Sequence, residues 1–76
     1  MTNEGMKVLT EQYHTFQSDT RLCEVWKTPE DEWATRHYIK DRGRVWIKDM
    51  VHKGHSELWA ESAAENWVLE VGGNEW

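Results

Sequence analysis

The stretch from Trp33 to Val51, WATRHYIKDRGRVWIKDMV, is the densest run of β-forming residues in the sequence. Its Val, Ile, Tyr, Trp and Thr side chains favour strands. The run is interrupted once, by the polar residues Asp41 and Arg42 followed by Gly43. These three residues suit a loop in which Asp41 and Arg42 form a type I turn and Gly43 takes the left-handed conformation of a following bulge. The stretch therefore predicts a β-hairpin near the middle of the chain.

The loop length fixes which hairpin residues lie opposite one another, and hence which face of the sheet each side chain occupies. A three-residue loop gives the pairs Ile39 with Val45, Tyr38 with Trp46, and Arg36 with Lys48. One face of the hairpin is then largely apolar and comprises Trp33, His37, Ile39, Val45, Ile47 and Val51. The opposite face is cationic and aromatic and comprises Arg36, Tyr38, Lys40, Arg44, Trp46 and Lys48.

An even-numbered loop is the alternative register. It pairs Arg36 with Asp49 and places Lys48 opposite His37, which avoids the cost of like charges facing each other. It also mixes apolar and charged residues on both faces, and a two-residue version needs Arg42 at positive φ. The three-residue loop is therefore the preferred prediction.

The segments before the hairpin are predicted from local patterns. Residues 7–16 fit a strand or a helix, and Thr, Tyr and Phe in their second half favour the strand. Residues 17–20 are typical of a turn, and residues 21–27 alternate as a strand with Cys23 and Val25 on one side. Residues 28–32 suit either a turn or the start of a helix over 29–40. Apolar residues of that segment scatter around a helical wheel, so a turn followed by a strand is expected.

A helix after the hairpin is the clearest prediction. Ser56 is a good N-cap, and Gly72 and Gly73 are typical of a helix end. Between them, apolar and small residues form one continuous side made of Trp59, Ala60, Ala63, Ala64, Trp67, Val68 and Val71. Leu58 and Leu69 fall outside this side. The predicted fold class is α+β, an antiparallel meander of three or four strands packed on one C-terminal amphipathic helix.

Composition narrows the class of protein. With 76 residues the chain predicts one small domain, with residues 1–5 and 73–76 as mobile ends and Trp76 without an assigned place. Cys23 is the only cysteine, so no intramolecular disulfide forms and a reducing cytoplasm is expected. No apolar run has the length of a signal-peptide core or a membrane span, so no membrane association is expected.

Charge is the compositional feature that points to a binding surface. The net charge is −5, yet five of the nine Lys and Arg residues lie between positions 36 and 48. The prediction is a non-enzymatic module that binds another protein, either through Leu58, Leu69 and Trp76 or through the exposed sheet face. The candidate residues of that face are Arg36, Tyr38, Lys40, Arg44, Trp46 and Lys48. The alternative is single-stranded nucleic acid, whose bases would stack on the aromatic rings of the same face. A third hypothesis is self-association, either edge to edge or through the apolar positions outside the main helix side. The expected state is a monomer or a weak homodimer.

Several chemistries lack the residues they require. No nucleophile elbow surrounds Ser56, and no Gly-rich loop could cradle a phosphate. His52 and His55, even with the lone Cys23, fall short of zinc-finger spacing. No catalytic residue, metal or cofactor is therefore expected. The size, acidity and tryptophan content suit an accessory or inhibitor protein of the kind that bacteriophages encode, acting in the host cytoplasm.

Overall fold

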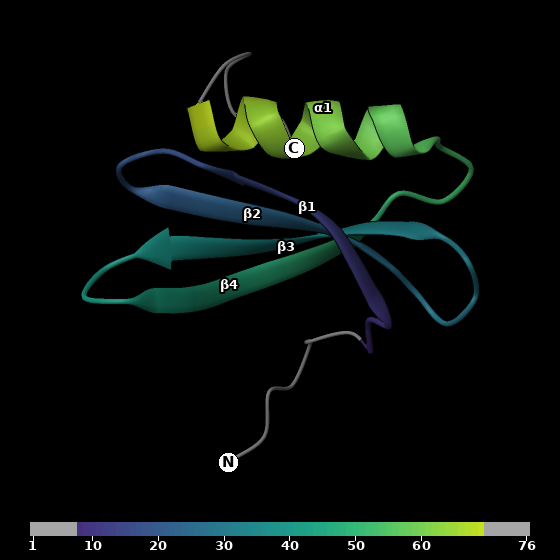
Figure 1. Ribbon diagram of the computed structural model, residues 1–76, viewed down its shortest axis with the longest axis horizontal. Helices are drawn as coiled ribbons and strands as arrows, with labels where there is room; N and C mark the ends of the chain where they lie inside the picture. Colours follow the sequence, from purple (N-terminus) through teal and green to yellow (C-terminus); the bar gives the residue numbers. More distant parts are fainter. Residues whose placement is uncertain (1–7, 70–76) are drawn as a thin grey trace.

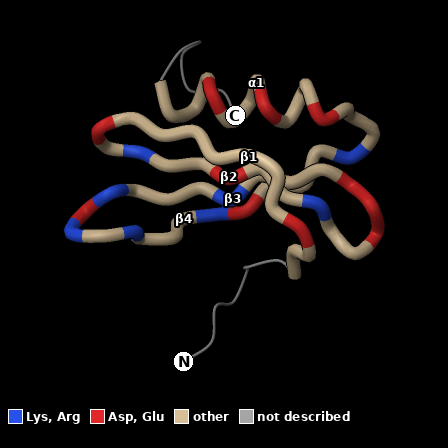
Figure 2. The backbone as a smooth tube through the Cα atoms, viewed as in Figure 1, with Lys and Arg blue, Asp and Glu red and all other residues tan. Residues whose placement is uncertain are grey.

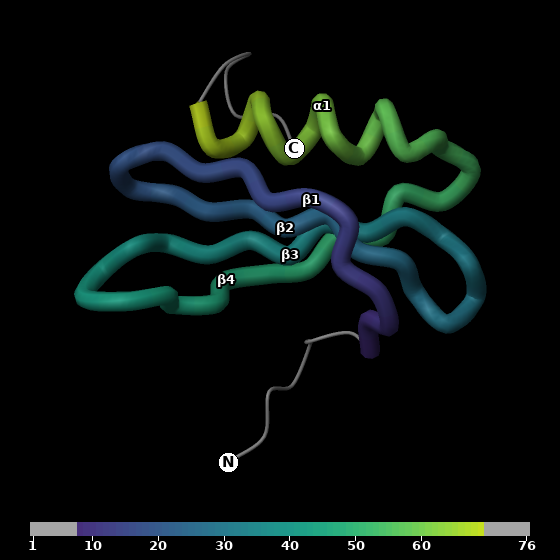
Figure 3. Tube along the Cα trace, viewed as in Figure 1, coloured from purple at the N-terminus to yellow at the C-terminus, as the bar shows by residue number. Residues whose placement is uncertain are grey.

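The computed structural model describes residues 8–69, which form one four-stranded antiparallel sheet and one helix (Figure 1). The strands are β1 (Glu11–Gln17), β2 (Arg21–Lys27), β3 (Trp33–Lys40) and β4 (Arg44–Val51), and the helix is α1 (Glu57–Leu69). The four strands lie side by side in chain order, so the chain meanders across the sheet before it forms the helix (Figure 3). The helix lies along one face of the sheet, and no other element of residues 8–69 covers the opposite face (Figure 1). The predicted α+β class is confirmed.

Polar side chains close the two turns that precede the hairpin. In the β1–β2 turn the Ser18 hydroxyl accepts a hydrogen bond from the backbone N–H of Arg21 at 3.2 Å. In the β2–β3 turn the Thr28 hydroxyl accepts one from the N–H of Glu32 at 3.1 Å, and Asp31 adopts a φ of 67°. Both turns were predicted, and β3 follows the second one directly. The alternative of a helix over 29–40 is wrong.

The β3–β4 hairpin contains both of the registers that its sequence allows. Near the loop, Ile39 pairs with Val45 and Tyr38 with Trp46, as the three-residue loop predicts. Beyond them the register shifts, so that His37 pairs with Lys48 and Arg36 pairs with Asp49. Ile47 is the extra residue of a β-bulge, which inserts one residue into one strand only. The predicted pairing of Arg36 with Lys48 is wrong because it would oppose like charges, whereas the bulge brings Asp49 to Arg36.

The bulge also corrects the predicted faces of β4. Residues directly opposite each other in an antiparallel pair share a face. Lys48 therefore lies on the same face as His37, toward α1, and Val51 lies on the opposite face with its partner Ala34. Both had been assigned to the other side of the hairpin.

The loop itself has the predicted length but a different conformation. Lys40 pairs with Arg44, which leaves three residues between the strands. Arg42 as well as Gly43 has a positive φ, 58° and 119° respectively, so the predicted type I turn is wrong. The N–H of Asp41 instead bonds the carbonyl of Gly43 at 3.0 Å.

The core lies between α1 and the central strands. The Ser56 hydroxyl caps the helix by accepting a bond from the N–H of Trp59 at 3.3 Å. The buried helix residues are Ala60, Ala63, Ala64, Trp67 and Val68. All of them except Ala63 form one cluster with Cys23 and Val25 of β2, and Phe16, Trp33 and Ile39 are partly buried against it. The small alanines allow the helix to approach the sheet closely.

Three predicted core residues are exposed instead. Val45 is 47% exposed and Ile47 is 41% exposed, because the helix lies over β1, β2 and β3 rather than over β4. Trp59 is 43% exposed and stacks on His55 with ring centroids 4.1 Å apart. The predictions for residues 1–5, Val71, Gly72, Gly73 and 73–76 fall outside the described residues. Within residues 8–69 no helix is long and apolar enough to cross a membrane.

Candidate functional site

The candidate functional site is the sheet face that α1 leaves uncovered, here named the open face. Strand alternation places on it Leu22, Glu24 and Trp26 from β2, Ala34, Arg36, Tyr38 and Lys40 from β3, and Arg44, Trp46 and Asp49 from β4. Five of the six residues predicted as a binding site therefore lie together, and Lys48 lies on the other face.

Glu24 holds together one part of the open face. Its side chain accepts hydrogen bonds from the indole N–H of Trp26 at 2.9 Å and from the Tyr38 hydroxyl at 3.4 Å. It also pairs with the Arg44 guanidinium at 3.0 Å. Glu24 is only 4% exposed, so these partners replace the water that a buried carboxylate loses. Burial, followed by the nearby Glu24 charge, raises the pKa of Tyr38 and keeps its hydroxyl protonated as a donor.

Asp49 holds together the other part. The Arg36 guanidinium donates to both Asp49 oxygens, from Nε at 3.0 Å and from Nη2 at 2.9 Å. The indole N–H of Trp46 donates to the same carboxylate at 2.8 Å. The Asp49 side chain is fully buried and that of Arg36 is 12% exposed. This bidentate geometry is the strong form of an arginine–carboxylate pair, and its hydrogen bonds raise the pKa of Arg36 further.

The same two arginines also lie over aromatic rings. The Arg36 guanidinium carbon is 5.7 Å from the Trp26 ring centroid, and that of Arg44 is 5.6 Å from the Tyr38 centroid. Guanidinium groups at this range are attracted by the negative face of the ring. Each arginine is therefore held both by a carboxylate and by a ring, while Trp26 and Tyr38 remain half-buried.

A hollow of about 320 Å³ lies at the end of the open face near the β3–β4 loop. Its lining residues are Thr15, Gln17, Leu22, Lys40, Gly43 and Arg44. Lys40 Nζ donates to the Ser18 carbonyl at 2.8 Å and to the Gln17 side-chain oxygen. Lys and Arg residues gather at this loop, whereas acidic residues mark the helix (Figure 2). The hollow is thus bordered by two cations.

Two carboxylates that organise the open face, Glu24 and Asp49, were not among the predicted site residues. Glu24 could have been found, because alternation placed it beside Leu22 and Trp26 on a single side of β2. Asp49 reaches the open face only through the bulge at Ile47. Its pairing with Arg36 was foreseen only in the rejected even-numbered register.

A second polar cluster lies buried on the helix side. The Thr35 hydroxyl is 2.8 Å from His37 Nε2 and 3.0 Å from His52 Nε2. Cys23 Sγ is 3.7 Å from His37 Nδ1, and the His37 ring meets the Trp67 ring edge to face at a centroid distance of 4.6 Å. Cys23, Thr35 and His37 are at most 1% exposed, and His52 is also buried.

A cysteine beside a histidine can be a catalytic pair, but the environment here opposes it. Burial, more than the Glu24 charge, raises the pKa of the Cys23 thiol to about 12. Burial, followed by the Lys48 and His52 charges, lowers the pKa of His37 to about 3. The reactive form of cysteine is the thiolate, and it is unpopulated near neutral pH under these conditions. The cluster therefore has the chemistry of a neutral, hydrogen-bonded core.

Comparisons with protein-family models, with curated proteins and with solved structures find no match to this chain. What bears on function is the chemistry of its own side chains. Among those, the open face combines aromatic rings, arginines and a hollow on one uncovered surface.

Proposed function

We propose that the protein is a small non-enzymatic binding module that engages another protein through the open face. The observation that carries this proposal is that Glu24 and Asp49 neutralise Arg44 and Arg36 within the face itself. The aromatic residues Trp26, Tyr38 and Trp46 stay half-buried above them. Aromatic rings and arginines held in fixed positions are typical anchors of protein interfaces.

Single-stranded nucleic acid is a weaker candidate for the same surface. Binding of a strand draws its free energy from cations that contact phosphates. On the open face three cations, Arg36, Lys40 and Arg44, lie beside two carboxylates whose side chains are buried, those of Glu24 and Asp49. A phosphate near either arginine would be repelled by the carboxylate that already pairs with it. The fourth cation proposed for this role, Lys48, lies on the helix side.

The hollow beside Lys40 and Arg44 indicates what the protein partner should present. Arg44 retains exposed surface, because its side chain is 56% exposed despite its pair with Glu24. The Lys40 ammonium is held by the uncharged Ser18 carbonyl and Gln17 side chain, so a carboxylate entering the hollow would supply its counter-charge, with the exposed part of Arg44 at the border. The expected partner surface is therefore largely apolar and aromatic, with an acidic side chain aligned on the hollow.

Self-association through strand edges has less support. Both edge strands, β1 and β4, carry a register irregularity, at Tyr13 and at Ile47 respectively. Bulges in edge strands twist the edge and interrupt the row of hydrogen-bonding groups that another strand would need. This is a common protection of a monomer against edge-to-edge pairing.

The proposal is tested by affinity capture from a lysate of the source organism, with nuclease added to one half of each sample. Bait proteins are the wild type, Trp46→Ala, Arg44→Glu and the control Leu58→Ala, which changes a residue on α1 that is 70% exposed. The expected result is a nuclease-resistant partner retained by wild type and Leu58→Ala and lost by both open-face variants. Circular dichroism confirms that each bait is folded. A partner lost on nuclease treatment, or retained by both open-face variants, would overturn the proposal.

A further inference from the structure

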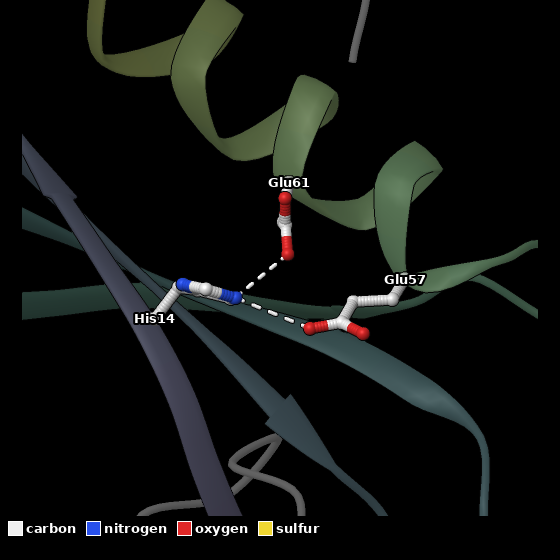
Figure 4. A group of neighbouring side chains, drawn as sticks. All are labelled: His14, Glu57 and Glu61. Carbon is white, nitrogen blue, oxygen red and sulfur yellow. Dashed lines mark hydrogen bonds and ion pairs between the residues drawn. The ribbon is translucent and has the colours of Figure 1, made fainter.

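Three metal-ligating side chains converge on the helix side of the sheet, away from the open face (Figure 4). His14 belongs to β1, where its pairing with Val25 turns it toward α1. Glu57 and Glu61 lie one turn apart at the start of α1. The His14 Nε2 atom is 3.1 Å from a Glu57 oxygen and 2.7 Å from a Glu61 oxygen. No short sequence motif predicts this cluster, because His14 and Glu57 are 43 residues apart in the chain.

The cluster has more negative charge than its own hydrogen bonds can satisfy. One imidazole nitrogen carries at most one proton, yet two carboxylate oxygens lie within hydrogen-bonding distance of it. Among residues 8–69, His14 is the only side chain that forms an ion pair with either glutamate. The side chains of His14, Glu57 and Glu61 are 45%, 41% and 25% exposed, so an ion can reach them from solvent.

We propose that His14, Glu57 and Glu61 form a binding site for one divalent transition-metal ion of the Zn²⁺ class. Such ions accept imidazole nitrogen and carboxylate oxygen together, at about 2.0–2.2 Å from the metal. In a tetrahedral site, ligand atoms at those bond lengths stand about 3.4 Å from one another. The two nitrogen–oxygen distances of 2.7 and 3.1 Å therefore need to open by less than about 1 Å, and the three donor atoms already lie within 4.8 Å of one another. Water would complete the coordination.

The proposed ion would join an edge strand to the helix. Most of β1 is exposed, and His14 is bonded across to the first turn of α1. An ion held by both elements binds the folded chain and not the unfolded one, so it raises the unfolding temperature by mass action. The site is independent of the open face, because it lies on the opposite side of the sheet.

The test uses the full-length, tag-free protein after removal of metal by a chelator. Calorimetric titration with ZnCl₂ at neutral pH is expected to show one ion per chain, and thermal unfolding is expected to shift upward with Zn²⁺. His14→Gln and Glu61→Gln should each weaken binding by about tenfold or more, a loss at least as large as that for second-layer residues around metals. His55→Gln is the matched control, since His55 is an exposed histidine that stacks on Trp59 outside the cluster.

Two spectroscopic measurements locate the ion. Zn²⁺ should shift the Nε2 resonance of His14 in long-range ¹⁵N spectra, and Co²⁺ should give tetrahedral absorption bands without thiolate charge transfer. The proposal is overturned if wild type binds Zn²⁺ no more tightly than millimolar, or if His14→Gln binds as well as wild type. Loss of binding in His55→Gln, or a cobalt–thiolate band from Cys23, would overturn it equally.

Discussion

Asp49 is the single residue on which the open face depends most. Its fully buried carboxylate accepts hydrogen bonds from Nε and Nη2 of Arg36 and from the indole N–H of Trp46. Replacing it with alanine leaves a mostly buried guanidinium without its counter-charge, which typically costs about 3–5 kcal/mol. We therefore expect Asp49→Ala to lower the free energy of unfolding by that amount in urea denaturation.

The matched control for Asp49 is Asp19→Ala, which removes an exposed aspartate from the β1–β2 turn. Surface substitutions of this kind usually change stability by less than about 0.5 kcal/mol. Equal stability of Asp49→Ala and Asp19→Ala would mean that the Arg36 pair contributes nothing to the fold.

His37 makes stability depend on pH. In the unfolded chain its imidazole binds a proton near its ordinary pKa of 6.5, whereas in the folded protein burial lowers that pKa to about 3. Between these values the unfolded state binds more protons, so stability is fully present above pH 6.5 and falls as the pH drops toward 3. One such group contributes a slope of up to about 1.4 kcal/mol per pH unit.

The measurement is urea unfolding across that pH range for the wild type and for His37→Leu, which cannot titrate at this position. Carboxylates contribute to the acid transition of both proteins, so the informative quantity is the difference between their slopes. We expect the wild type to lose stability more steeply below pH 6.5. Parallel curves would show that the pKa of His37 is not lowered in the folded protein.

At the scale of elements, the strands β2, β3 and β4 were predicted from their own residues. The single uniform register predicted for β3 and β4 holds only near the loop. Two local preferences conflict within the hairpin: the loop at Gly43 favours Tyr38 opposite Trp46, while charge favours Arg36 opposite Asp49. No uniform register satisfies both. The bulge at Ile47 allows both, with Tyr38 opposite Trp46 on its loop side and Arg36 opposite Asp49 on the other side. No local sequence pattern predicts the position of such a bulge residue.

Ile47, the bulge residue, is apolar, yet its replacement by a charged residue is expected to change stability little. At 41% exposed, and on a strand that α1 does not cover, its side chain contributes little to the core. We expect Ile47→Lys to change the free energy of unfolding by about 0.5 kcal/mol or less. Val25→Ala, at a fully buried position of β2, is the contrast and should cost more. Unfolding of Ile47→Lys would show that α1 covers β4 after all.

The helix depends on Trp67 for its attachment to the sheet. Its ring contacts His37 edge to face, and the Arg21 guanidinium lies 4.8 Å from its centroid while donating to its carbonyl at 2.9 Å. Trp67→Ala should cost about 3–5 kcal/mol, enough to unfold a domain of this size. Trp59→Ala, which removes a half-exposed ring of the same helix, should remain folded in thermal denaturation. A cooperative unfolding transition for Trp67→Ala at the wild-type temperature would contradict this packing.

At the scale of the whole molecule, the sheet separates two surfaces with different chemistry. Sequence alternation predicted the open face as a set of cations and aromatic rings, and placed Arg36, Tyr38, Lys40, Arg44 and Trp46 together correctly. The neutralisation of the face from within was not predicted. Alternation placed Glu24 on one side of β2 but did not connect that strand with the hairpin, and Asp49 reaches the face only through the bulge. The cluster of His14 with Glu57 and Glu61 was not predicted either, because its residues come from β1 and α1, which meet only in the folded chain.

The internal neutralisation of the open face is tested most directly by titrating labelled single-stranded oligonucleotides into the protein at about 50 mM and 200 mM salt. The Trp46 indole resonance reports on the face itself, because its N–H donates to Asp49. We expect no binding tighter than millimolar at the lower salt, and no shift of that resonance. Tight binding that weakens with salt and disappears in Trp46→Ala would contradict this expectation and make single-stranded nucleic acid the ligand of the open face.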